Sequence, residues 1–125
     1  MTTAWQLQIK NLYKSFRMAD GLKRSILNKI DIDVAHGEFL VITGKSGCGK
    51  TTLLRIIAGL EKADEGSVYC CGSIHKGLLP RLSFVFQQDT LFAWMNIWNN
   101  IAYPMQIKKR PENEINEQVK KVLKQ

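Results

Sequence analysis

Alternating apolar and polar residues near the N-terminus predict two strands that each expose one face to solvent. Residues 5–10 (WQLQIK) and residues 30–34 (IDIDV) both follow this period-two pattern. Residues 35–38 (AHGE) then predict a turn. Residues 39–43 (FLVIT) are a continuous apolar run, which is typical of a strand buried on both faces. The chain is therefore predicted to begin with half-exposed antiparallel strands and to continue with a buried one.

The middle of the chain predicts one helix and two further strands. Residues 50–60 form the helix, and its leucines and isoleucines cover most of the circumference, so we expect it to be largely buried. Gly59 lies near its expected end, where glycine commonly terminates helices. Residues 67–71 and residues 82–86 (LSFVF) are short apolar runs that predict strands.

Two more helices are predicted toward the C-terminus. The first has one apolar face, made by four residues at helical spacing: Trp94, Ile97, Trp98 and Ile101. Pro104 is expected to end this helix, because proline lacks the N–H that the next turn requires. Residues 111–124 predict the second helix, with acids in the first turn and bases in the last, which suits the helix dipole.

The net charge of +7 is concentrated in two segments. The first basic segment contains five cations: Lys10, Lys14, Arg17, Lys23 and Arg24. The second occupies residues 108–110. Such surfaces attract phosphate, nucleic acid or anionic membranes. We interpret them as solvated surface, and direct nucleic-acid binding is not expected, because no nucleic-acid-binding module is recognisable.

The composition predicts one cytoplasmic domain. A chain of 125 residues that is 45% hydrophobic and 23% charged suits a single globular domain. Its three cysteines are odd in number, which disfavours a disulfide framework. The N-terminus lacks an apolar signal segment, and the longest uncharged stretch, residues 90–107, contains too many polar groups for a bilayer-spanning helix.

The segment GKSGCGKTT has the spacing of a phosphate-binding loop, between a predicted strand and a predicted helix. Its glycines let backbone N–H groups turn toward a phosphate, and the helix N-terminus adds partial positive charge. Lys50 is expected to contact the β- and γ-phosphates, and Thr51 to bind Mg²⁺ through its hydroxyl. The residues predicted to bind the nucleotide are Gly44, Lys45, Ser46, Gly47, Cys48, Gly49, Lys50, Thr51 and Thr52.

Longer segments carry a family resemblance. They read NLYKSF, GEFLVITGKSGCGKTTLLRIIAGLEKADEGSV and VFQQ, and together they closely resemble the ATP-binding subunits of ABC transporters. The resemblance implies an α/β fold of the P-loop NTPase class: an ABC-type ATPase core with an N-terminal antiparallel β subdomain, truncated before the Walker B strand. Residues 1–125 would be the N-terminal half of that nucleotide-binding domain. LFAWMNI, residues 91–97, is similar to importers of nitrate, sulfonate and taurine, although Ala93 replaces a common proline.

The resemblance also implies roles for residues outside the loop. Phe16 would stack on the adenine of ATP, unless it is an ordinary core or edge aromatic. Gln87 would be the Q-loop glutamine, which reaches Mg²⁺ or the attacking water, unless it is only a polar residue at a strand end. The face around Trp94 would lie near the membrane-spanning subunit or simply pack in the core. The implied partners are that subunit and a second ATP-binding subunit, on the inner face of the cell membrane.

Several segments of the family are missing from the sequence. We find no LSGGQ-type signature, no apolar run followed by Asp-Glu and no switch histidine, so the chain offers no catalytic base. The first interpretation is an ATPase that couples hydrolysis to import of a small solute. The alternatives are a non-hydrolysing nucleotide-binding or regulatory fragment and, with less support, a small-molecule kinase. We also expect the apolar run at residues 39–43 to leave an open sheet edge.

Overall fold

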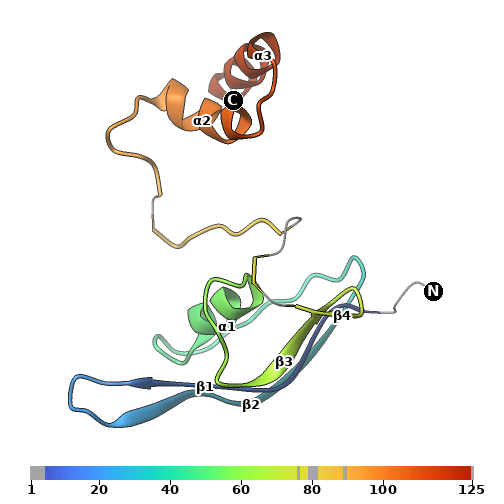
Figure 1. The fold of residues 1–125 in the computed structure, drawn as a ribbon, viewed down its shortest axis with the longest axis vertical. Helices are drawn as coiled ribbons and strands as arrows, with labels where there is room; N and C mark the ends of the chain where they lie inside the picture. The colour runs from blue at the N-terminus through green and yellow to red at the C-terminus, as the bar shows by residue number, and fades with distance from the viewer. Residues whose placement is uncertain (1–4, 76, 79–81, 89, 125) are drawn as a thin grey trace. The chain divides into compact units, whose positions relative to one another are not determined.

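The computed structural model describes residues 5–75, 77–78, 82–88 and 90–124 (Figure 1). The elements in this part of the chain are β1 (Trp5–Arg17), β2 (Lys23–Ala35), α1 (Lys50–Ile57), β3 (Glu65–Cys70), β4 (Ser73–Ile74), α2 (Ile97–Ile107) and α3 (Glu112–Leu123). The chain divides into two compact units, Met1–Phe84 and Val85–Gln125, and each has a hydrophobic cluster of its own.

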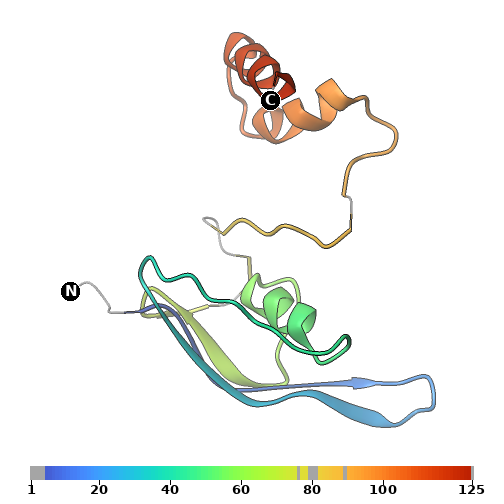
Figure 2. The ribbon, with the colours of Figure 1, turned by 180° about the vertical axis from the view of Figure 1, so that it is seen from behind.

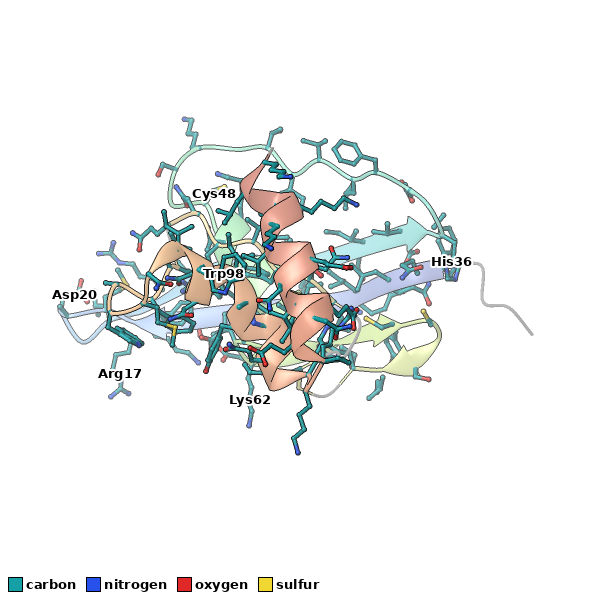
Figure 3. The ribbon with its side chains drawn as sticks, turned by 90° about the horizontal axis from the view of Figure 1, so that it is seen from above. Arg17, Asp20, His36, Cys48, Lys62 and Trp98 are labelled. Carbon is teal, nitrogen blue, oxygen red and sulfur yellow. The ribbon has the colours of Figure 1, made fainter. Side chains whose placement is uncertain are left out.

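The first unit is built on an antiparallel four-stranded sheet with the strand order β2-β1-β3-β4. β1 and β2 have 13 residues each and form a long hairpin, so the two predicted strands are confirmed and extend beyond their alternating segments. Figure 3 shows Arg17 and Asp20 at one end of this hairpin and His36 at the other. β1 pairs with β2 along one edge and with β3 along the other, which places it in the middle of the sheet.

Helix α1 lies on one face of this sheet (Figures 1 and 2). The core between them consists of six buried side chains: Ile9, Leu12, Leu27, Leu53, Ile56 and Val68. Each such side chain contributes about 1.5–3 kcal/mol when it leaves water. α1 begins at Lys50 as predicted but ends at Ile57 instead of residue 60, and Leu54 and Leu60 are exposed. The buried face of the helix is therefore narrower than the apolar pattern indicated.

The two predicted strands at residues 39–43 and 82–86 are absent from the structure. Both segments have an irregular backbone. Several of their apolar side chains are open to solvent, with Phe39 89% and Val85 92% exposed, whereas Ile42 packs against the core. A strand needs a hydrogen-bonded neighbour, and no strand among the described residues pairs with either segment. The expected open sheet edge is therefore also wrong, because this segment joins no sheet.

The second unit is a pair of helices, α2 and α3. Its buried residues are Ala102, Ile115 and Val119, with Trp98, Ile101 and Met105 packed against them. The helix predicted for residues 111–124 is confirmed as α3, which carries Glu112 and Glu114 in its first turn. The prediction that Pro104 ends α2 is wrong, since the helix continues to Ile107. Met105 in the last turn of α2 packs against the buried residues, and this contact favours continuation of the helix past the proline.

In the part of the chain that the structure describes, no helix is both long and apolar enough to cross a bilayer. The longest described helix is α3 with 12 residues, whereas a membrane crossing requires about 20.

Candidate functional site

The predicted phosphate loop connects the irregular segment at residues 39–43 to the first turn of α1. Gly49 is the residue before the helix, and its φ of 101° is one that residues with a side chain rarely adopt. A Cβ at this position would lie 2.9 Å from Cγ2 of Ile26 and 3.0 Å from its carbonyl oxygen. Glycine therefore serves here both for its backbone angle and because the loop packs directly against β2.

Lys50 folds its side chain back over the loop. Its Nζ donates hydrogen bonds to the carbonyl oxygens of Gly44 at 2.7 Å and Lys45 at 2.8 Å, and it lies 3.7 Å from the Sγ of Cys48. The ammonium group thus lies among the loop residues. Its hydrogen bonds to the two backbone oxygens are exposed to solvent. A phosphate that accepts hydrogen bonds from the same Nζ would replace weak neutral acceptors with strong anionic ones.

The N-terminus of α1 provides further attraction for an anion. The first turn contains no acidic residue, and the first N–H groups of any helix have no partner within it. Thr51 is exposed and Thr52 is half-buried in this turn. Ser46, Gly47 and Cys48 are also exposed, so the loop is open to a ligand from solvent. Among the nine predicted loop residues, which are consecutive in the chain, Lys50 contacts Gly44, Lys45 and Cys48.

Phe16 lies near the end of β1, opposite Arg24 of β2, and its side chain is half-buried. The same strand β2 carries Ile26, against which Gly49 packs. The predicted base-stacking residue and the phosphate loop therefore contact neighbouring positions of one strand. Lys14 Nζ stands over the Phe16 ring, 4.8 Å from its centroid.

Lys14 is not the solvated surface cation that the charge pattern indicated, because only 8% of it is exposed. Its Nζ lies 2.8 Å from Glu61 Oε1 and 3.5 Å from Asp64 Oδ1, and it donates a 2.7 Å hydrogen bond to the carbonyl oxygen of Lys62. The hydrogen bond to Glu61 raises the pKa of Lys14, although burial of the ammonium acts against it. The same hydrogen bond lowers the pKa of Glu61, so both groups stay ionised at neutral pH.

Asp64 completes this cluster through Ser15. One carboxylate oxygen accepts hydrogen bonds from the Ser15 backbone N–H at 2.9 Å and from its hydroxyl at 2.6 Å, and these bonds lower the pKa of Asp64. The chain just beyond α1 is thereby fixed to β1. Sequence reasoning missed this cluster, although the position of Lys14 between Leu12 and Phe16, two residues from each in a strand, was a signal that it shares a face with apolar neighbours.

The remaining predicted site residues belong to the second unit. Gln87 is exposed and lies in an irregular segment ahead of α2, so its role as a magnesium or water ligand stays a prediction. Trp94 is 78% exposed and precedes α2, whereas Trp98 packs on the core of the helix pair. The four apolar residues at helical spacing therefore do not form one buried face.

A separate concavity of about 570 Å³ lies at the opposite end of α1 from the loop. Its walls include Leu12, Ile56, Val68 and His75, and the Nε2 atom of His75 is buried with no hydrogen-bond partner. None of residues 44–52 lines this cavity.

Comparison with known proteins agrees with these features. The family model for ABC transporters matches residues 27–125, which includes the phosphate loop and everything after it. The chain belongs to the ABC transporter family. The expected resemblance to ABC ATP-binding subunits is therefore confirmed at the level of the family.

Several curated members of the family are similar to this chain. The spermidine/putrescine import ATP-binding protein PotA of Fusobacterium nucleatum is 43% identical over 121 residues, which cover 94% of this chain and 31% of PotA. PotA of Thermotoga maritima is 40% identical over 121 residues, covering 94% and 32%. An ABC transporter ATP-binding protein of Methanocaldococcus jannaschii is 42% identical over 119 residues, covering 95% and 44%. The chain thus spans about a third of the length of the PotA relatives.

Solved ABC structures share the fold. A dimeric ATP-binding cassette in a post-hydrolysis state, bound to ADP and phosphate, superimposes with a TM-score of 0.80 at 29% identity, covering 94% of this chain and 56% of that one. A second dimeric structure, a bacterial ABC transporter cassette, gives a TM-score of 0.77 at 30% identity, covering 94% and 54%. The predicted fold class, an ABC-type ATPase core with an N-terminal antiparallel β subdomain, is confirmed.

Proposed function

We propose that this chain is the nucleotide-binding part of an ABC transporter ATPase, which binds ATP together with Mg²⁺. The observation that carries the proposal is the loop of residues 44–49 with the Lys50 ammonium held inside it, at the N-terminus of α1. Backbone N–H groups, a helix N-terminus and a lysine form the combination that binds a triphosphate. Lys50 would contact the β- and γ-phosphates, and the loop backbone would surround them.

Mg²⁺ fits the residues at this site. The ion prefers oxygen ligands and usually keeps several water molecules. The Thr51 hydroxyl is an oxygen donor in the exposed first turn of α1, beside the position proposed for the phosphates. We propose Thr51 as one magnesium ligand and Gln87 as a second. When bound, the ion would neutralise charge on the phosphate oxygens.

The base of the nucleotide would stack on Phe16. The ring is half-buried and belongs to the hairpin against which the phosphate loop packs. An aromatic face can stack on a purine without hydrogen bonds to the base. This position would let one ligand contact the loop and the hairpin together.

Hydrolysis and transport involve more than this chain's own residues. The sequence has no catalytic base, so we propose that it supplies phosphate and magnesium binding while the whole transporter ATPase couples ATP hydrolysis to import of a small solute. Its proposed partners are a membrane-spanning subunit and a second ATP-binding subunit, at the inner face of the cell membrane. The dimeric cassettes of similar fold support the second partner.

The PotA relatives are named for spermidine and putrescine, whereas the segment at residues 91–97 resembles importers of nitrate, sulfonate or taurine. These two indications point to different solutes. We therefore extend the proposal to a small solute and to no narrower class.

Isothermal titration calorimetry with Mg²⁺–ATP tests the proposal directly. Lys50→Ala removes a charge-assisted contact worth about 1.5–3 kcal/mol, so we expect the affinity to fall about tenfold to a hundredfold. Lys120→Ala is the matched control, because it removes one positive charge from an exposed position of α3. Equal affinity of wild type and Lys50→Ala would overturn the role of Lys50.

A binding module without turnover is the second candidate, and the missing catalytic base favours it for the chain by itself. Release of phosphate from ATP by the purified chain distinguishes the two. Steady turnover that Lys50→Ala abolishes would support an ATPase, and binding without release would support the module. Transfer of phosphate to a metabolite would instead indicate a kinase.

A further inference from the structure

Lys14 is a buried cation whose position is fixed by the loop beyond α1. Its Nζ contacts three acceptors, namely the Glu61 carboxylate, the Asp64 carboxylate and the Lys62 carbonyl oxygen. An ammonium group has three protons, so these contacts use its hydrogen-bonding capacity. Unlike an exposed lysine, it therefore has one defined location, which the surrounding acceptors determine.

The same ammonium group occupies one face of the Phe16 ring, with its Nζ 4.8 Å from the ring centroid. This distance is within the range of a favourable cation–π contact. The contact restrains the ring, because rotation of Phe16 away from Lys14 would lose it.

The acceptors of Lys14 connect this ring to the phosphate loop. Glu61 and Asp64 follow α1, while Lys50 and the loop lie at its other end. α1 is only eight residues long, about 12 Å. The hairpin therefore holds both ends of the helix: Gly49 packs on Ile26 at the start, and Lys14 binds Glu61 beyond the end.

We propose that Lys14 is a positioning residue for the nucleotide base: it holds the Phe16 ring against the end of α1, so that a purine stacks on Phe16 while its phosphates occupy the loop. This inference rests on the proposed function of Phe16. The ligand class is a purine nucleoside triphosphate, and Lys14 acts through Phe16 without touching the ligand.

Two ligands separate positioning of the base from general damage to the fold. Mg²⁺–ATP has a base, and magnesium tripolyphosphate has the phosphates alone. Lys14→Met keeps the aliphatic stem and removes the cation, and we expect the ATP affinity to fall about threefold to tenfold while tripolyphosphate affinity stays unchanged. Lys10→Met is the matched control, because Lys10 lies in the same strand and its Nζ bonds Asp33 at 2.9 Å on the exposed surface. It should change neither affinity.

Phe16→Leu distinguishes failure of this inference from failure of the proposed function. If Phe16→Leu leaves the ATP affinity unchanged, the stacking role of Phe16 is wrong. If Phe16→Leu weakens ATP and Lys14→Met does not, the positioning role of Lys14 is wrong. If Lys14→Met lowers the affinities for ATP and tripolyphosphate equally, Lys14 has only a structural role. The double variant should bind ATP no more weakly than Phe16→Leu, since Lys14 acts through that ring.

Lys14→Arg keeps the experiment decisive if the methionine variant does not fold. The guanidinium retains the charge and can still lie over an aromatic ring, so we expect ATP affinity within about twofold of wild type. Glu61→Gln weakens the ion pair with Lys14 without removing the cation. It should lower the affinity for ATP and leave the affinity for tripolyphosphate unchanged. An effect of Glu61→Gln on tripolyphosphate of the same size would overturn the proposal.

Discussion

The close approach of two backbone segments at Gly59 leads to a quantitative prediction. Gly59 follows α1 with a φ of 73°, and a Cβ built on it would lie 1.9 Å from the Gly77 carbonyl oxygen and 2.3 Å from the Gly77 carbonyl carbon. These distances are far below van der Waals contact. Gly59→Ala therefore requires residues 77–78 to move away from the end of the helix.

Comparison with Gly21 separates two costs of Gly59→Ala: the collision of the new methyl group and the strain of a positive φ. Gly21 has nearly the same φ, 79°, but a Cβ there would meet no atom within 4 Å. Alanine in this left-handed region costs about 1–2 kcal/mol at either position. The collision at Gly59 adds an overpacking cost of about 1–3 kcal/mol. We expect Gly59→Ala to destabilise the chain by about 2–5 kcal/mol and Gly21→Ala by about 1–2 kcal/mol.

Urea denaturation followed by circular dichroism measures this difference. Urea slopes of about 1–3 kcal/mol per molar convert an extra 1–3 kcal/mol into a difference in midpoint on the order of 1 M. The slope itself should stay unchanged, since neither variant alters the surface that unfolding exposes. Equal midpoints for the two alanine variants would refute the reasoning, because they would mean that the segments do not touch in solution.

Three further predictions concern the rest of the fold. The pKa of Asp64 is lowered in the folded state, so its contribution to stability is present above the ordinary carboxylate pKa of about 4 and is lost as the pH falls through the lower folded value. Asp64→Asn should therefore make the urea midpoint depend less on pH between about pH 5 and pH 2, and an unchanged pH dependence would contradict this. The Asn100 side chain accepts a 2.7 Å hydrogen bond from the Phe92 N–H and donates a 3.2 Å hydrogen bond to the Phe92 carbonyl oxygen. Asn100→Ala should therefore speed amide hydrogen exchange at Phe92 by at least about tenfold, and equal exchange rates would count against these bonds. Leu12 is fully buried, so Leu12→Ala should lower the free energy of unfolding, measured by thermal denaturation, by about 2–5 kcal/mol. Leu22→Ala at an exposed position should lower it by less than about 0.5 kcal/mol, and similar losses of stability in the two variants would disprove this core.

The parts of the fold that depend on local pattern were predictable from the sequence. Alternation identified the hairpin, acid–base placement identified α3, and glycine spacing identified the loop at residues 44–52. These signals are local because each reports a backbone or dipole requirement of its own segment. The family resemblance then supplied the fold class, which no single segment determines.

Three of the wrong predictions concern features that depend on neighbours elsewhere in the chain. The apolar run at residues 39–43 predicted a buried strand, but pairing requires another strand and hydrophobicity alone does not provide one. Pro104 was expected to end a helix, yet packing on α3 extends it. The charge of Lys14 predicted exposure, whereas Glu61 and Asp64, which lie far along the chain, compensate the buried cation.

The pairing of β1 with β3 also has a kinetic consequence. Tyr13 of β1 pairs with Glu65 of β3, and the chain between them contains β2, the phosphate loop and α1. Joining strands separated by roughly fifty residues costs about 3–4 kcal/mol of loop-closure entropy, whereas the β1–β2 hairpin closes a short turn. Hairpin formation should therefore precede docking of β3 during refolding. Competence to bind ATP should then recover in a slower phase than the first β-sheet signal.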